Sequence, residues 1–358
     1  MTTEEKLNLV REVGEEIITE EDIKKLYDSG EPLVAYDGFE PSGQIHIAQG
    51  VLRAININKM TKTGVKFKMW VADWHAWANN KMGGDLDKIQ TTGKYFIEVW
   101  KACGMDLTNV EFIWASELVK DHNYWKLVLQ IAKTNSLKRF IRTAEIMGRE
   151  ESMDLTAAQI IYPCMQVADI FMLGANITQL GMDQRKVNML AREIGEQLGY
   201  WKPVVVSHHM LMGLGTPATE TEDKTKRTIE LKMSKSKPDS SIFMTDTRED
   251  IQRKITKAWC PEGVITENPI LEYCKYLLFE KYDTMVIERP EKFGGNLTFH
   301  SYAELEKTFA EKQLHPMDLK ATVIKMLDEI LQPVRKHFEE NEEAKKLLQA
   351  VQSYQVTR

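Results

Sequence analysis

The sequence predicts an α/β fold in which a doubly wound, mostly parallel sheet is followed by a smaller, mainly helical part. Short apolar runs of strand length alternate with helix-length segments as far as residue 207, and after residue 246 the strand-like runs largely stop. A length of 358 residues is also more than one hydrophobic core usually holds. We therefore expect N-terminal helices over 1–30, a sheet domain over 31–245 with an inserted helical segment at about 115–160, and a helical domain over 246–358.

Each element follows from a local pattern. Leu7, Val10 and Val13 have helical spacing and Thr19 is a helix cap, so the first thirty residues predict two short helices. The sheet region predicts strands at 33–36, 67–72, 110–115, 176–180 and 203–207, with helices at 46–63, 85–103, 155–173 and 183–198. The last part predicts helices at 248–259, 269–279, 302–312 and 317–352, and a small hairpin near 285–299.

Composition excludes several classes of protein. With 43% hydrophobic and 28% charged residues, the chain is neither disordered nor fibrous. It has no apolar run long enough for a membrane span, and its N-terminus is acidic where a signal peptide is basic, so we expect a cytoplasmic protein with no membrane contact. Four scattered cysteines form no CxxC motif, which argues against disulfides and a zinc site.

The net charge of −6 argues against general coating of a nucleic acid, yet one stretch is basic. Residues 121–149 contain six lysines and arginines but only two acidic residues. Such a stretch binds phosphates or is simply a solvated helix face, and the residues alone leave both interpretations open.

Two short motifs predict phosphate binding. Lys232-Met233-Ser234-Lys235-Ser236 follows a polar segment, 216–230, that we expect to be a mobile loop, and its two lysines could close over a polyphosphate. The turn from the first strand of the sheet domain into its helix contains His46, where helix N–H groups attract phosphate. Either motif alone could be a solvated turn or a structural histidine. The turn lacks GxGxxG, which argues against a nicotinamide-dependent dehydrogenase.

Together the two motifs resemble the paired ATP-binding signatures of the class I aminoacyl-tRNA synthetases, which have a Rossmann-like catalytic domain. The first signature, usually His-Ile-Gly-His, is His46-Ile47-Ala48-Gln49 here, and the second is intact. Gln49 is a neutral amide that can donate a hydrogen bond but carries no charge.

Further motifs sharpen the resemblance to the tyrosyl-tRNA synthetases of archaeal and eukaryotic cytosolic type. It covers about residues 32–331 through five separated motifs, at 36–43, 161–170, 181–186, 292–295 and 315–318. Independently, Tyr162, Gln166 and Asp169 share one face of a helix and need polar partners. A polar network that satisfies itself in the core is the alternative interpretation of that face.

The resemblance implies roles for individual residues. Tyr36 and Asp169 would hold the phenolic hydroxyl of tyrosine, and Tyr162, Gln166 and Gln184 its ammonium group. Asp183 would hold the ribose of ATP. The implied catalytic residues are His46, Gln49, Lys232 and Lys235; the implied ATP-binding residues are Gly38, Ser42, His46, Asp183, Met233, Ser234, Lys235 and Ser236; the implied tRNA-binding residues are Arg142, Arg185, Lys186, Phe293, His315 and Asp318.

The implied activity is that of a tyrosine–tRNA ligase: ATP activates L-tyrosine to tyrosyl-adenylate with release of pyrophosphate, and the tyrosyl group passes to the 3′ end of tRNA(Tyr). Mg²⁺ would arrive with the ATP phosphates, because no carboxylate cluster suggests a dedicated metal site. The family also implies a homodimer, and the apolar, aromatic stretch 114–129 is a candidate for its interface. The alternatives are a tryptophanyl-tRNA synthetase and a non-catalytic RNA-binding protein derived from a synthetase.

Overall fold

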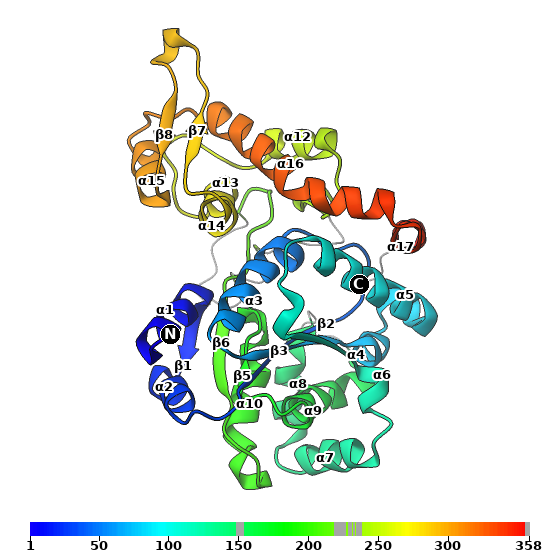
Figure 1. Ribbon diagram of the computed structural model, residues 1–358. Helices are drawn as coiled ribbons and strands as arrows, with labels where there is room; N and C mark the ends of the chain where they lie inside the picture. The colour runs from blue at the N-terminus through cyan, green and yellow to red at the C-terminus, as the bar shows by residue number, and fades with distance from the viewer. Residues whose placement is uncertain (148–153, 218–226, 228–230, 232, 234–237, 355–358) are drawn as a thin grey trace.

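The computed structural model describes residues 1–147, 154–217, 227, 231, 233 and 238–354. Its centre is a six-stranded sheet with helices on both sides, and a mainly helical part that carries a two-stranded hairpin lies above the helices of one face (Figure 1). The predicted α/β class, with a mostly parallel sheet, is confirmed. Among the described residues, every helix is too short or too polar to cross a membrane.

The sheet has the strand order β1-β6-β5-β2-β3-β4, and every neighbouring pair is parallel except β1 with β6. Its strands are β1 Gly14–Ile18, β2 Val34–Phe39, β3 Lys66–Val71, β4 Val110–Trp114, β5 Ile177–Thr178 and β6 Val204–His208. The first parallel strand, β2, lies in the middle, so the chain winds outward on both sides of it. This is the doubly wound arrangement that the sequence predicts.

β1 is an element that the sequence analysis missed. The two predicted N-terminal helices are present as α1 Thr3–Val13 and α2 Glu20–Asp28, but the five residues between them form an edge strand antiparallel to β6. Ile17 pairs with Val206 and Ile18 with Val205 in that ladder. Two glutamates and two isoleucines give no clear alternation, so the strand is defined by its partner and not by its own pattern.

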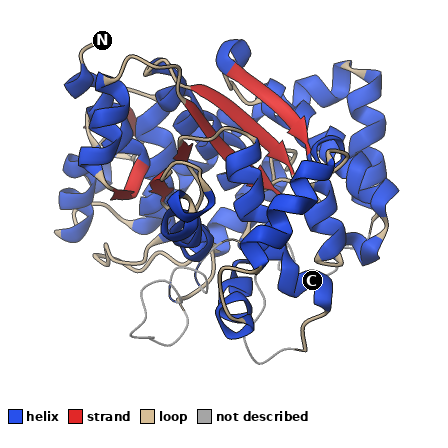
Figure 2. Cartoon of the chain, turned by 90° about the horizontal axis from the view of Figure 1, so that it is seen from below, coloured by secondary structure: helices blue, strands red, loops and turns tan. Residues whose placement is uncertain are grey.

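Helices lie on both sides of the sheet (Figure 2). Its side chains alternate between the two faces. Ala35 and Met69 pack into one core cluster, whereas their neighbours Tyr36 and Trp70 pack into the other. The first cluster includes residues of α1, α3 Arg53–Lys62 and α5 Leu86–Ala102, and the second includes residues of α7 His122–Ala132, α8 Leu137–Thr143, α9 Ala157–Met172 and α10 Arg185–Ile194. Two short helices, α4 Asp73–Ala78 and α6 Ala115–Leu118, follow β3 and β4.

The part of the chain after residue 246 consists of helices and one small hairpin. The elements are α12 Arg248–Lys257, α13 Pro269–Tyr273, α14 Phe279–Lys281, β7 Met285–Ile287, β8 Leu297–Phe299, α15 Tyr302–Ala310, α16 Pro316–Glu340 and α17 Glu342–Ser353. The expected single helix over 317–352 is wrong, because Asn341 is extended and its side chain caps α17 by accepting from the backbone of Glu343 and Ala344.

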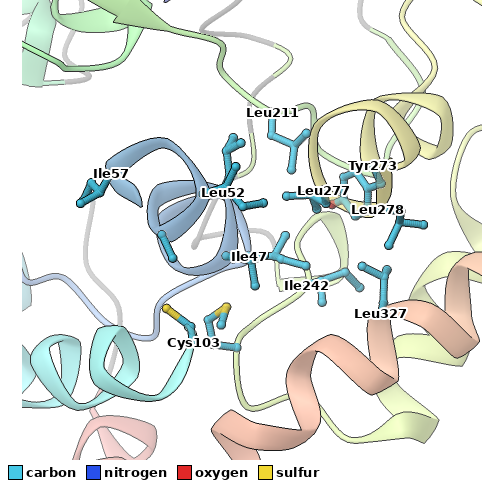
Figure 3. Packing of buried hydrophobic residues seen from close by; sticks show 14 of the residues in the cluster. Ile47, Leu52, Ile57, Cys103, Leu211, Ile242, Tyr273, Leu277, Leu278 and Leu327 are labelled. Carbon is cyan, nitrogen blue, oxygen red and sulfur yellow. The ribbon is translucent and has the colours of Figure 1, made fainter. Parts of the chain in front are cut away.

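The helical part shares a core with the sheet domain. Ile47 and Leu52, which follow β2, belong to the same buried cluster as Tyr273, Leu277 and Leu327 (Figure 3). Because this packing is apolar and continuous, the position of α13 and α16 relative to the sheet is fixed by burial on both sides.

Candidate active site

The winding of the sheet reverses between β2 and β5, and ligands of doubly wound sheets bind beyond the carboxyl ends of strands at such a point. Tyr36, Asp37 and Gly38 lie at this end of β2, and residues 181–184 follow β5. Gln179 joins the two by donating its backbone N–H to the carbonyl of Tyr36, at 3.0 Å. The motifs at 36–43 and 181–186 therefore meet at the carboxyl ends of β2 and β5. This end of the sheet is called the edge below.

A buried carboxylate lies below this edge. Asp169, on α9, is 0% exposed; its Oδ1 accepts from the Tyr124 hydroxyl at 2.9 Å, and its Oδ2 lies 2.8 Å from His75 Nε2. The Tyr36 hydroxyl is also buried and has no hydrogen-bond partner in the described part of the chain. Burial raises the pKa of Tyr36 well above its ordinary value, and the nearby charges of Asp169 and Asp37 raise it further. This hydroxyl is therefore a neutral donor beside a carboxylate.

His75, the neighbour of Asp169, lies on α4, directly after β3. Burial by itself lowers the pKa of its imidazole, but the charge of Asp169 and its direct contact outweigh burial, so the net shift is upward. The ring also lies edge-on to Tyr162, with 5.2 Å between the ring centroids. Asp169 thus favours the protonated form of His75, and the two side chains lie in direct contact.

Amide and hydroxyl groups form the wall of the pocket above Asp169. Gln166 Nε2 donates to Gln184 Oε1 at 3.1 Å, and Gln184 Nε2 donates to the carbonyl of Ile146 at 3.1 Å. Tyr162 donates to Glu40 Oε1 at 2.8 Å. Gln166 Oε1 is buried and has no partner among the described residues. Tyr162, Gln166 and Gln184, which were predicted to act together, thus lie around one site.

Glu40 is a site residue that the sequence analysis missed. It follows β2 directly and accepts from Asn79 Nδ2 at 3.0 Å as well as from Tyr162. The only available signal was its place in the motif at 36–43, where an acidic side chain directly follows a buried strand. Glu40 thus adds a carboxylate beside Tyr162, with Lys81 Nζ 3.7 Å from its Oε2.

The first ATP signature begins with a π-helical turn and not with a regular helix. Ala48–Leu52 form this turn before α3, in place of the helix expected from residue 46. The preceding residues pair with a distant segment: Ile47 donates its N–H to the carbonyl of Ile242 at 2.8 Å, and His46 bridges Phe243. The segment that follows the second ATP signature in sequence therefore lies against the first.

Only Met233 of the second signature lies in the described part of the chain; Lys232, Ser234, Lys235 and Ser236 lie outside it. The Met233 side chain is buried and accepts from the Tyr273 hydroxyl at 3.9 Å, while its backbone N–H donates to the carbonyl of Leu211 at 3.4 Å. Any contact of Met233 with a nucleotide would thus use its backbone.

The other predicted nucleotide-binding residues surround the same edge. Gly38 donates its backbone N–H to Asp37 Oδ1 at 2.8 Å, and Asp183 is partly buried in a 3₁₀ turn after β5. Ser42 is partly buried in the loop after β2. The carbonyl of Gln49 accepts from Trp100 Nε1 at 2.9 Å, which fixes the π-helical turn to α5.

A buried charged cluster below the edge was not expected from the sequence. Arg53, 1% exposed at the start of α3, brings its Nε to 3.1 Å from Asp37 Oδ2 and its Nη1 to 3.0 Å from His208 Nδ1. Its Nη2 donates to Gln179 Oε1. Burial raises the pKa of Asp37 to about 7 against the opposing pull of Arg53. Sequence reasoning could not find this cluster, because a single arginine on a helix is usually solvated.

The predicted tRNA-binding residues fall into two separate groups. Arg142, on α8, is exposed, whereas Arg185 pairs with Glu16 at 2.8 Å and Lys186 pairs with Glu145. The second group lies on the distant hairpin and the start of α16 (Figure 1). It consists of Phe293, which is 59% exposed, His315, which caps α16, and Asp318 in the first turn of that helix.

Comparisons with known proteins agree with this geometry. A family model described as tRNA synthetases class I (W and Y) matches residues 28–332. The chain is 49% identical to tyrosine–tRNA ligase 1, cytoplasmic, of Arabidopsis thaliana over 99% of its own length and 90% of that protein's, and 42% identical to the tyrosine–tRNA ligase of Thermococcus sibiricus over 98% and 99%. The crystal structure of tyrosyl-tRNA synthetase from Pyrococcus horikoshii with L-tyrosine superposes with a TM-score of 0.91 at 38% identity, covering 98% of this chain and 100% of that one.

The chain therefore belongs to the class I tRNA synthetases of the tryptophan and tyrosine group. Within that group it belongs to the tyrosine–tRNA ligases of archaeal and eukaryotic cytosolic type, which are enzymes that use ATP. The resemblance inferred from the sequence is confirmed. A tryptophanyl-tRNA synthetase from Aeropyrum pernix is only 18% identical, so its TM-score of 0.67 shows a shared fold alone.

Proposed function

We propose that this chain activates L-tyrosine with ATP and transfers the tyrosyl group to the 3′ end of tRNA(Tyr). The observation that carries the proposal is the pair of buried polar groups below the switch point, the Tyr36 hydroxyl and the Asp169 carboxylate. The pair suits a phenol, because a phenolic hydroxyl both donates and accepts one hydrogen bond.

The pair also explains selectivity against phenylalanine. Tyrosine would donate its hydroxyl proton to Asp169 and accept from Tyr36, whose raised pKa keeps it protonated. Phenylalanine would leave both buried groups without a partner, which costs more than the missing hydrogen bonds alone. Binding of the ring in this pocket thus selects the amino acid before any chemistry occurs.

The ammonium group of tyrosine would bind the polar wall. The buried oxygen of Gln166 is an acceptor for an N–H donor, and Gln184 and Tyr162 are held beside it by hydrogen bonds. The carboxylate of Glu40, 2.8 Å from the Tyr162 hydroxyl, adds negative charge on the same side. An ammonium held here would direct the substrate carboxylate toward the first ATP signature.

Activation needs no general base on the protein. An oxygen of the tyrosine carboxylate attacks the α-phosphorus of ATP, the bond from that phosphorus to the β-phosphate oxygen breaks, and pyrophosphate leaves. The protein aligns the reactants and stabilises the added charge. We assign this role to His46, Gln49, Lys232 and Lys235, with Gly38, Ser42, Met233, Ser234 and Ser236 around the phosphates and Asp183 at the ribose.

Mg²⁺ fits this site as an ion carried by the nucleotide. The described residues contain no group of three or more histidine, cysteine, aspartate or glutamate side chains placed to hold a metal. Asp37 is paired with Arg53 and is therefore a poor cation ligand. When bound to the ATP phosphates, the ion would neutralise charge on the departing pyrophosphate.

For the second step, a hydroxyl of the terminal ribose of tRNA attacks the carbonyl carbon of the adenylate, and AMP leaves. We assign the acceptor stem to Arg142, Arg185 and Lys186, with tRNA phosphates replacing Glu16 and Glu145 as partners of the last two. We assign the anticodon to the helical domain over 246–358. Exposed Phe293 would stack on a base, and His315 and Asp318 would contact base edges.

We also propose that the chain is a homodimer in the cytoplasm. The apolar side chains Trp125 and Leu129 are exposed on α7, and Trp125 packs on Trp74 with 6.1 Å between ring centroids. Exposed apolar side chains on one helix support a subunit interface there. Sedimentation should give a dimer for the wild type and a monomer for Leu129→Asp, and a monomeric wild type would contradict this.

The experiment that tests the proposed function is charging of tRNA. Purified protein with ATP, Mg²⁺, labelled tyrosine and total tRNA should give label that precipitates with the RNA. The matched control is the same tRNA after periodate oxidation, which destroys the terminal ribose diol and should abolish the signal. Equal labelling of intact and oxidised tRNA, or none of either, would exclude the ligase reaction.

A further inference from the structure

His208 lies at the carboxyl end of β6, beside the edge where the nucleotide is proposed to bind. Its backbone N–H donates to the carbonyl of Leu180 at 2.9 Å, and it forms an isolated parallel β-bridge with Gly181. A Cβ placed on Gly181 would lie 2.4 Å from Met210 Sδ, 2.7 Å from Asp183 Oδ1 and 3.5 Å from His208 Nε2. The imidazole and the carboxylate therefore converge on the same small space above this glycine.

The buried cluster determines which nitrogen of His208 carries the proton. Nδ1 lies 3.0 Å from Arg53 Nη1 and 3.1 Å from Gln179 Nε2. A guanidinium can only donate, and Gln179 must present its amide nitrogen to the ring because its oxygen accepts from Arg53 Nη2. Nδ1 is therefore an acceptor, and the proton of the neutral ring is on Nε2.

The charge state of His208 agrees with this assignment. Burial lowers the pKa of His208 well below its ordinary value, and the charge of Arg53 lowers it further. The ring is thus neutral at physiological pH. Among the described residues, Nε2 makes no hydrogen bond, and it lies 3.5 Å from the place of a Cβ on Gly181, on the same side as Asp183.

We propose that His208 binds the nucleotide by donating its Nε2–H to a ribose hydroxyl of ATP, which in turn donates to Asp183. Arg53 and Gln179 are positioning residues that fix the tautomer. A ribose hydroxyl both accepts and donates, so a donor and a carboxylate on either side of it form a complementary pair. This inference rests on the proposed activation reaction and adds a residue to it.

His208→Asn separates the two functions of the ring, because an asparagine amide reaches about as far as Nδ1 and can still accept from Arg53, but has no group in the place of Nε2. In tyrosine-dependent exchange of pyrophosphate, this variant should have kcat/KM for ATP about 3- to 10-fold lower than the wild type. The loss should disappear with either 2′-deoxyATP or 3′-deoxyATP, which lack the hydroxyl concerned. His208→Gln, whose amide nitrogen reaches the place of Nε2, should recover part of the activity with ATP.

The matched control is His209→Asn, which changes the adjacent histidine. His209 contacts Glu15 at 3.0 Å and Glu272 at 3.1 Å, so its loss should not alter the ratio of activities with ATP and the deoxynucleotides. A His208→Asn penalty that is equal for all three nucleotides, or no penalty, would overturn the proposal. A wild type without exchange would contradict the proposed function itself, and this inference with it.

Discussion

His75 Nε2 lies 2.8 Å from Asp169 Oδ2, while Tyr124 donates to the other oxygen of the same carboxylate at 2.9 Å. All three side chains are buried, so the direction of the carboxylate, on α9, is set by groups on two other helices, α4 and α7. Amino-acid selectivity therefore depends on Asp169 and also on residues that hold it. The hydrogen bond from Tyr124 and the close contact with His75 hold the carboxylate in one orientation.

Replacing Asp169 tests the floor of the pocket. Asp169→Ala should lower kcat/KM for tyrosine in pyrophosphate exchange by about 10- to 100-fold, because a hydrogen bond to a charged acceptor is lost. The preference for tyrosine over phenylalanine should fall by the same factor. Normal tyrosine activation by a folded variant would show that Asp169 does not bind the substrate.

Tyr36→Phe removes only the hydroxyl that would donate to the substrate. We expect kcat/KM for tyrosine to fall by about 3- to 10-fold, with kcat/KM for phenylalanine unchanged or raised. Tyr95→Phe is the matched control, because it removes another buried tyrosine hydroxyl, on α5, outside the pocket. Equal losses of selectivity in the two variants would show a general packing effect.

His75 should make stability depend on pH. Its pKa is raised in the folded state from an ordinary value of 6.5, so its contribution is fully present below pH 6.5 and is lost as pH rises through the folded value. Unfolding in urea should therefore show a larger stability difference between the wild type and His75→Gln at pH 6 than at pH 9. The wild type should be the more stable of the two at pH 6. A difference that grows with pH would mean that His75 is buried as a neutral ring.

Gly50, directly after the first ATP signature, allows close contact with the segment 242–244, which follows the second. A Cβ at this position would lie 2.3 Å from the sulfur of Met244, which is fully buried beside the paired segment. Gly50→Ala should lower stability by about 1–3 kcal/mol and raise KM for ATP, because the segment 242–244 must move. At Gly215, where a Cβ would contact nothing within 4 Å, the same substitution should change neither quantity, and equal effects at both positions would refute the packing argument.

Phe293 tests the anticodon assignment. Phe293→Ala should lower kcat/KM for tRNA charging by about 5- to 100-fold through loss of base stacking, with pyrophosphate exchange and melting temperature unchanged. Val286→Ala, on the same hairpin and 45% exposed, should leave charging intact. Charging by Phe293→Ala at the wild-type rate would exclude a stacking role.

The succession of strands and helices along the sheet domain could be predicted from the sequence, because apolar runs of strand length alternate with amphipathic helices. β1 could not, since an edge strand of two glutamates and two isoleucines has no pattern of its own and forms only against β6. The break at Asn341 was hidden for a similar reason: apolar residues continue at helical spacing on both sides of it.

The polar face of α9 could be predicted because Tyr162, Gln166 and Asp169 interrupt an apolar helix at helical spacing. Their partners could not, because His75, Tyr124 and Glu40 come from elements far apart in sequence. The cluster around Arg53 could not be predicted either, because its partners also come from distant parts of the sequence. A buried charge is recognised only when the fold brings its partner to it.

The most direct test of the account is amino-acid-dependent exchange of pyrophosphate into ATP, with tyrosine, tryptophan and phenylalanine supplied separately to folded protein and Mg²⁺. The account predicts exchange with tyrosine and little with the other two, which would also show that Gln49 in the first ATP signature is compatible with catalysis. Exchange with tryptophan in preference to tyrosine, or with none of the three, would contradict it.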